Sequence, residues 1–168
     1  METQCTIKVR TYECDSYNHV NNANYLHYLE YARYEYLKEI GFNYDKAFND
    51  GYGTYISRIE IDYKKPAFTD DELVIKSKPV KKGAVSGTIS QQIWRVKKKH
   101  SVSCVDEQKQ KDVAQEKVTN CNKNSEPLGE RTCEDELIID AKVTWVFVNS
   151  KGMPVKIPPE WDMPGLKP

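Results

Sequence analysis

Short polar side chains crowd residues 14–24 of this chain, which read CDSYNHVNNAN. Asp15 is the only acidic residue between Glu13 and Glu30, and His19 follows it by four positions. A carboxylate in such a setting can act as a general base or as a nucleophile, and an Asp–His pair can activate water. A histidine at this spacing can equally hydrogen-bond the backbone and fix a turn, so the role of His19 stays open.

A long helix is predicted to follow this polar stretch. Large side chains recur every three or four positions, at 25, 28, 29, 32, 36 and 40, and therefore line one side of a helix. Gly41 ends the pattern, because glycine readily takes the left-handed conformation found at helix C-termini. Tyr31 and Tyr34 widen the apolar face, so we expect a deeply enclosed helix.

The start of this helix is predicted to be capped but free of acidic side chains. Asn18, Asn21 and Asn22 are of a residue type that caps helices, and the sequence NNANY places no Asp or Glu in the first turn. A helix N-terminus exposes backbone N–H groups and carries about half a positive charge. It would polarise a carbonyl and stabilise a developing oxyanion. With Asp15 beside it, this arrangement fits acyl transfer.

Other kinds of chemistry find less support. We reject Cys14 as a nucleophile, because along a strand its side chain should point to the face opposite Asp15. A metal site made from His19, His27 and an acid fits no known ligand spacing, and His27 is interpreted as a packing or surface residue. The five cysteines include no C-x-x-C pair, so we expect reduced, unpaired thiols. No nucleotide-binding loop motif is present.

Most of the remaining chain alternates between apolar and polar residues, which predicts β-strands. The expected strands cover about 4–12, 54–65, 71–80, 84–96 and 137–149, with a short helical turn and loop at 43–53. In the last strand, Leu137, Ile139, Ala141, Val143, Trp145 and Phe147 should share one face. One long early helix followed by antiparallel-looking strands indicates an α+β fold in which a sheet wraps around a helix.

Length and composition limit the class of protein. A chain of 168 residues predicts one domain over 1–168, but a polar segment at about 97–135 lacks aromatic residues and should form a flexible insertion. The 25 basic and 25 acidic residues give none of the positive excess of a nucleic-acid binder. No apolar run is long enough for a membrane span, and the first residues lack a signal-peptide core. We therefore expect a cytoplasmic protein.

The stretch from Ile7 to Leu37 resembles the opening of the hotdog-fold acyl-CoA thioesterases of the 4-hydroxybenzoyl-CoA thioesterase-like superfamily. It is most similar to the long-chain acyl-CoA thioesterase branch, and plant acyl-ACP thioesterases carry a similar D-x-x-x-H-V-N-N-x-x-Y string. IEIDYKKPAFTDDELVI and LIIDAKVTWVFVN also resemble strands of that family. The resemblance covers roughly residues 5–96 and 136–157 and leaves out the polar segment.

This resemblance implies a hotdog fold, in which a five-stranded antiparallel sheet wraps around a long central helix. It implies hydrolysis of acyl-CoA to a free acid and coenzyme A in fatty acid metabolism, without a metal ion or any cofactor beyond the coenzyme A of the substrate. It further implies a homodimer or homotetramer with sites at the subunit interface. Asp15 matches the catalytic aspartate, as general base or nucleophile. Asn22 matches the residue whose backbone N–H polarises the thioester carbonyl.

The family motif also assigns supporting roles. His19, Asn18 and Asn21 are expected to orient the loop and the acyl group, and Tyr25 is placed among the substrate-binding residues. Basic side chains near turns are expected to lie close to the phosphates of coenzyme A, and the candidates are Lys64, Lys65, Lys81 and Lys82. Two alternatives remain open. One is an acyl-ACP thioesterase, and the other is a non-catalytic acyl-binding or interaction module whose charged insertion contacts a partner.

Overall fold

The computed structural model describes residues 1–96, 135–162 and 165. The flexible insertion expected at about 97–135 lies almost entirely outside these residues. The described elements, in chain order, are β1 (Thr3–Lys8), the 3₁₀ turn η1 (Thr11–Glu13), α1 (Asn22–Glu39), α2 (Tyr44–Asn49), β2 (Tyr52–Tyr63), β3 (Glu72–Lys82), β4 (Ser86–Arg95), β5 (Glu136–Asn149) and η2 (Pro159–Trp161). No helix among them is long and apolar enough to span a membrane.

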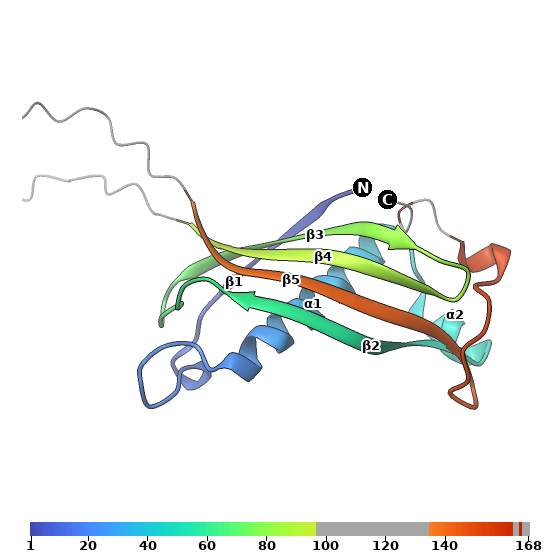
Figure 1. The fold of residues 1–168 in the computed structure, drawn as a ribbon, viewed down its shortest axis with the longest axis horizontal. Helices are drawn as coiled ribbons and strands as arrows, with labels where there is room; N and C mark the ends of the chain where they lie inside the picture. The colour runs from blue at the N-terminus through green and yellow to red at the C-terminus, as the bar shows by residue number, and fades with distance from the viewer. Residues whose placement is uncertain (97–134, 163–164, 166–168) are drawn as a thin grey trace, which may run out of the picture. The chain divides into compact units, whose positions relative to one another are not determined.

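The five strands form one antiparallel sheet in the order β1-β3-β4-β5-β2, and α1 runs along one face of it (Figure 1). This confirms the expected α+β hotdog architecture. The strands occur nearly where alternation predicted them, although the first one ends at Lys8 because the chain turns into η1. β3 continues through Lys82, past a bulge between Pro79 and Lys81, where a turn had been expected.

The apolar side of α1 packs against the sheet. Its buried residues keep the predicted spacing of three or four and are Tyr25, Tyr28, Leu29, Ala32, Arg33 and Tyr36. Gly41 has the positive φ of 86° expected of a helix end. The prediction for Tyr31 and Tyr34 is wrong, since these side chains are 48% and 44% exposed. The sheet covers only one side of α1, so residues on its flanks stay outside the core.

A buried polar network joins the middle of α1 to the sheet. Arg33 Nη1 donates a 2.9 Å hydrogen bond to Gln91 Oε1. Gln91 Nε2 in turn donates to the Leu29 carbonyl and to Ser77 Oγ, both at 3.0 Å. Arg33 also pairs with Glu30. Buried polar groups are costly unless they are hydrogen-bonded, so these contacts let an arginine and a glutamine occupy the core.

Two further bulges lie in the two longest strands, β2 and β5. In β2 the pairing with β5 shifts between Ile56 and Arg58, which leaves Ser57 as the extra residue of a bulge. In β5 the pairing with β4 shifts so that Leu137 faces Trp94 and Ile139 faces Ile93. Ile138 and Ile139 are consequently both buried, and Leu137 does not continue the inward face as predicted. A bulge reverses the side-chain alternation on one side of it.

Candidate active site

The polar stretch after η1 folds back on itself as a tight loop. The Asp15 N–H donates to the His19 carbonyl at 2.9 Å, and the Asn18 N–H donates to the Asp15 carbonyl at 3.0 Å. Asn18 has a φ of +64°, a left-handed conformation that asparagine tolerates better than most residues. Asp15 Oδ1 accepts the Tyr17 N–H at 2.9 Å. The loop therefore holds the Asp15 carboxylate in place while leaving 23% of its side chain exposed.

The His19 ring lies between two oxygen acceptors. Its Nδ1 is 3.3 Å from the Val20 carbonyl and 3.5 Å from Asp15 Oδ2. The shorter contact fits the turn-fixing role, while the longer one keeps the imidazole close to the carboxylate. Both roles considered from the sequence are thus compatible with one ring position.

The start of α1 is capped by one of the three candidate asparagines. Asn21 is the N-cap, and its side chain accepts the Ala23 N–H at 2.9 Å. Asn18 shapes the preceding loop instead, and Asn22 is the first residue of the helix. No acidic residue lies in the first turn, as predicted. The Asn22 N–H sits at a position for which the helix itself provides no acceptor.

Glu13 connects this loop to α1, a role that the sequence did not reveal. Its side chain is buried, and Oε2 accepts the Arg10 N–H at 2.7 Å and the Tyr28 hydroxyl at 2.8 Å. Its carbonyl accepts the Asn21 N–H at 3.0 Å and Asn24 Nδ2 at 2.6 Å. Burial and the hydrogen bond to Glu13 raise the pKa of Tyr28. No sequence spacing relates Glu13 to Tyr28, because fifteen positions separate them.

A cavity of about 580 Å³, the Asp15 hollow, opens beside the start of α1. It is lined by Asp15, Tyr17, His19, Val20, Asn22, Tyr25, Tyr63, Lys64, Lys65 and Pro66. The fold thus brings together six of the residues singled out from the sequence. Among them Tyr25 is buried, and its hydroxyl accepts the Ala67 N–H at 3.0 Å, so this ring also fixes the wall of the hollow. Asn18 and Asn21 shape the surrounding backbone.

The four candidate lysines divide into two pairs. Lys64 and Lys65 border the Asp15 hollow, where Lys64 Nζ lies 2.9 Å from Asp62 Oδ2 and Lys65 pairs with Glu136. Lys81 and Lys82 stand at the far end of β3, roughly 30 Å away along the strand at about 3.3 Å per residue. Within one chain the structure therefore does not bring Lys81 and Lys82 to the site.

Cys14 lies outside the Asp15 hollow. Its Sγ lies 3.3 Å from Thr69 Oγ1. Within the described ranges, no cluster of three or more His, Cys, Asp or Glu side chains could hold a metal ion. The donors gathered around Asp15 are instead suited to acid–base chemistry on an organic substrate.

A sheet curled over a central helix, with a carboxylate and the acid-free start of that helix lining one cavity, is the arrangement of the hotdog-fold thioesterases. The chain belongs to the thioesterase-like superfamily, whose family model matches residues 9–162. The match spans the polar loop, α1 and all strands from β2 onward.

Two relatives each match about half of the chain. Similarity to the long-chain acyl-CoA thioesterase FadM of Escherichia coli is 37% identity over 94 residues, covering 55% of this chain and 68% of FadM. Similarity to the chloroplastic acyl-acyl carrier protein thioesterase ATL3 of Arabidopsis thaliana is 34% over 88 residues, covering 52% of this chain and 43% of that protein. The alignment thus spans less than half of the plant relative.

Solved structures show the same fold over nearly the whole chain. The 4-hydroxybenzoyl-CoA thioesterase from Pseudomonas sp. strain CBS-3 superposes with a TM-score of 0.69 at 17% identity, covering 95% of this chain and 96% of that one. YbaW from Escherichia coli superposes with a TM-score of 0.64 at 25% identity, covering 94% and 92%.

Proposed function

We propose that this protein hydrolyses the thioester of acyl-CoA to a free carboxylic acid and coenzyme A. The observation that carries the proposal is the meeting, in one hollow, of the Asp15 carboxylate and the acid-free N-terminus of α1. Resemblance of the chain to FadM supports a long-chain acyl group and the acyl-CoA form of the substrate.

The proposed reaction uses the two groups on the two sides of the thioester. The Asn22 N–H and the helix dipole polarise the carbonyl oxygen and stabilise its negative charge as the carbon becomes tetrahedral. Asp15 takes a proton from the attacking water, the C–S bond breaks, and the proton passes to the departing thiolate. Alternatively, Asp15 attacks directly, giving a mixed anhydride and the thiolate, and water then cleaves the anhydride.

The coenzyme A portion is proposed to extend over the basic rim of the same hollow. Lys64 and Lys65 provide that rim, although each already pairs with a carboxylate in the substrate-free structure. Lys81 and Lys82 contribute only if a second copy of the chain brings them close. We propose a homodimer or homotetramer with the site at the subunit interface, which is supported by the unpaired outer edge of β2 in the described sheet. A cytoplasmic location and a role in fatty acid metabolism stay predictions.

Release of free thiol from a panel of acyl-CoA thioesters tests the proposal. Asp15→Asn and Asp15→Ala should lower kcat by roughly 10²-fold or more, the usual contribution of a general base. Asp50→Asn is the matched control, since this exposed aspartate on the end of α2 pairs only with Lys46 among the contacts described. If both Asp15 variants release thiol with a kcat within about twofold of that of the unmodified protein, the mechanism is wrong.

A single turnover in heavy-oxygen water distinguishes the two forms of the mechanism. If water attacks the thioester, the heavy oxygen appears in the acid formed in the first turnover. If Asp15 attacks and water then cleaves the anhydride at the aspartate carbonyl, the first acid carries an unlabelled oxygen from the protein.

An acyl-ACP thioesterase is the second candidate, and similarity to ATL3 favours it. Matched acyl-CoA and acyl-ACP substrates decide between carriers through their kcat/KM values. A non-catalytic acyl-binding module would bind both without releasing thiol. The Asp15 carboxylate and the acid-free helix start argue against such a module, because binding alone requires neither.

A further inference from the structure

Arg95, the last residue of β4, lies next to the Asp15 hollow without being part of its lining. In the sheet it pairs with Glu136, the first residue of β5, at the end of the sheet near which the loop before α1 also lies (Figure 1). Its side chain is only 20% exposed. A largely covered charge needs close partners that offset its lost hydration. Most partners of this arginine belong to the chain segment that borders the hollow or to the residues that hold it.

Segment 64–68, the wall segment, runs along one side of the Asp15 hollow, and its first three residues line the cavity. Arg95 Nη1 donates to the Pro66 carbonyl at 3.3 Å and to Asp71 Oδ2 at 2.9 Å. The same Asp71 oxygen accepts the Phe68 N–H at 2.9 Å, and the guanidinium carbon lies 5.9 Å from the centre of the Phe68 ring. The guanidinium therefore holds the wall segment at two points.

The wall segment is bonded in turn to the loop that carries Asp15. The Val20 N–H donates to the Ala67 carbonyl at 2.8 Å, and His19 forms a β-bridge with Phe68. The His19 carbonyl accepts the Asp15 N–H at 2.9 Å. A chain of contacts thus runs from the guanidinium through the wall segment to the residue with the proposed catalytic carboxylate.

The wall segment is also bonded to α1. The Ala67 N–H donates to the Tyr25 hydroxyl at 3.0 Å, and the Tyr25 side chain is buried. Tyr25 stands one turn after Asn22, whose N–H is proposed to polarise the thioester carbonyl. One short segment therefore contacts both the loop and the helix that supply the two proposed reacting groups.

The charges around the guanidinium balance. Arg95 Nη2 pairs with Glu136, and Glu136 also pairs with Lys65 of the wall segment. With Asp71, the cluster holds two cations and two carboxylates. Arg95→Lys would keep this balance. Its compact ammonium lacks the planar fork with which arginine reaches two carboxylates and a carbonyl together.

We propose that Arg95 is a positioning residue that sets the distance between the Asp15 carboxylate and the Asn22 N–H. It acts through the wall segment and touches none of the reacting atoms. A displacement of about 1 Å at a catalytic group can cost about a hundredfold in rate, so a side chain outside the hollow can control turnover. This inference rests on the hydrolysis proposed above.

The kinetics of thiol release test the positioning role. Arg95→Ala should lower kcat by about tenfold to a hundredfold and change KM much less, and Arg95→Lys should lose less of kcat. Arg58→Ala removes an exposed arginine of β2 that pairs with Glu60, and this control should leave kcat unchanged. If both Arg95 variants keep kcat within about twofold, or if their losses lie in KM alone, the proposal is overturned. Should Arg95→Ala not fold, the kcat of Arg95→Lys decides.

Chemical rescue separates positioning from a general loss of folding. Ethylguanidinium has the shape of the group that Arg95→Ala removes, and the partial exposure of this position lets it enter from solvent. It should raise the kcat of that variant several-fold. Ethylammonium at the same concentration carries the same charge without the planar fork and should raise kcat less. Equal effects of the two cations would contradict the role assigned to the guanidinium.

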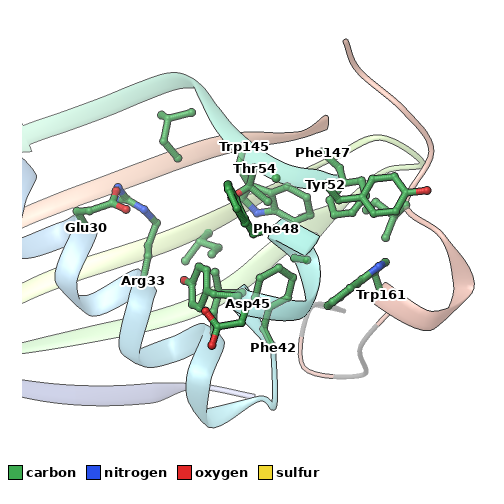
Figure 2. Close-up of a pocket in the computed structure, with 17 residues that line it drawn as sticks. Glu30, Arg33, Phe42, Asp45, Phe48, Tyr52, Thr54, Trp145, Phe147 and Trp161 are labelled. Carbon is green, nitrogen blue, oxygen red and sulfur yellow. The ribbon is translucent and has the colours of Figure 1, made fainter. Parts of the chain in front are cut away.

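Hydrogen exchange tests the same contacts without any substrate. In Arg95→Lys, the amides of Val20 and Ala67 should exchange at least about tenfold faster, because both hydrogen bonds depend on the wall segment. The amides of α2 should keep their rates. This helix follows α1, and its Phe48 borders a second cavity of about 440 Å³ together with Phe42 (Figure 2).

Two results of the exchange experiment would overturn the positioning role. One is unchanged exchange at the two loop and wall amides, and the other is faster exchange in α2 to the same extent, which would mean a general loss of stability. If the unmodified protein releases no thiol, the proposed hydrolysis is wrong, while hydrogen exchange still decides whether the arginine holds the wall segment. The two failures are therefore distinguishable.

Discussion

The hydrogen bond between Glu13 and Tyr28 should be among the strongest single contributions to the stability of this site. Glu13→Ala leaves the buried Tyr28 hydroxyl without its acceptor and removes the 2.7 Å bond from the Arg10 N–H. An unsatisfied buried donor costs about 1–3 kcal/mol, and the lost bond to a charged acceptor adds a comparable amount. We expect a loss of about 3 kcal/mol in the free energy of unfolding. For a domain of this size that lowers Tm by about 6–12 °C.

Tyr28→Phe should cost less, about 1–2 kcal/mol, because Glu13 keeps the Arg10 N–H as a donor. The double variant should be more stable than the sum of the two single losses predicts. Once the carboxylate is gone, removing the hydroxyl also removes the unsatisfied donor. The expected coupling is about 1–3 kcal/mol.

Urea unfolding of the four proteins at one protein concentration, followed by circular dichroism, measures this coupling. Glu39→Ala, a glutamate exposed on the outer side of α1, should change stability by no more than about 0.5 kcal/mol and serves as the control. If the losses for Glu13→Ala and Tyr28→Phe add within about 0.5 kcal/mol, the two groups do not interact as described, and the anchoring of the loop must lie elsewhere.

Three further predictions concern single positions. Gly41→Ala should cost about 1 kcal/mol in urea unfolding, because φ is +86° while nothing lies within 4 Å of the added methyl group, so a loss near zero would contradict the backbone argument. Hydrogen bonds from Lys65 and Arg95 lower the pKa of Glu136 to about 2, so the stability that they provide is present above pH 4.5 and is lost as the pH falls toward 2. Glu136→Gln should therefore make the urea midpoint depend less on pH between 4.5 and 2. The same pH dependence in the variant and the unmodified protein would refute the assignment. Burial raises the pKa of Cys5 to about 11, so iodoacetamide should alkylate it at pH 8 about a hundredfold more slowly than free glutathione, as mass spectrometry of the peptide would show.

Local patterns allowed most of the fold to be predicted. The spacing of large residues in α1, the cap at Asn21 and the approximate positions of the strands depend on neighbours along the chain, and these agree with the structure. The exposed positions of Tyr31 and Tyr34 were missed because a helix pattern does not show how much of the helix a sheet covers. The bulge in β5 was missed because it depends on the pairing of β5 with β4, which is distant in the sequence. Nothing in the local sequence around Ile138 shows that it is the extra residue of a bulge.

Part of the candidate site could be predicted from the sequence for the same reason. Asp15, His19 and Asn22 lie within eight residues, so their proximity follows from a loop and a helix start. Lys64 and Lys65 join them because the loop pairs with the segment before β3: the Val20 N–H donates to the Ala67 carbonyl, and His19 forms a β-bridge with Phe68. The role of Glu13 was not predicted, because it depends on hydrogen bonds with residues that only the folded structure brings close, such as the one from the Tyr28 hydroxyl. The sequence alone does not show that an acidic residue near a loop will be buried.

The polar network around Gln91 fixes the registry of the central helix on the sheet. Sliding α1 by one turn, 5.4 Å, would keep apolar rings over apolar strands but would carry the Arg33 guanidinium away from the buried Gln91 side chain that accepts its hydrogen bond. Asn22 lies eleven residues, about 16 Å, upstream on the same rigid helix. Gln91 does not line the Asp15 hollow, yet it fixes the position of α1 along the sheet and therefore the position of the Asn22 N–H proposed to polarise the carbonyl.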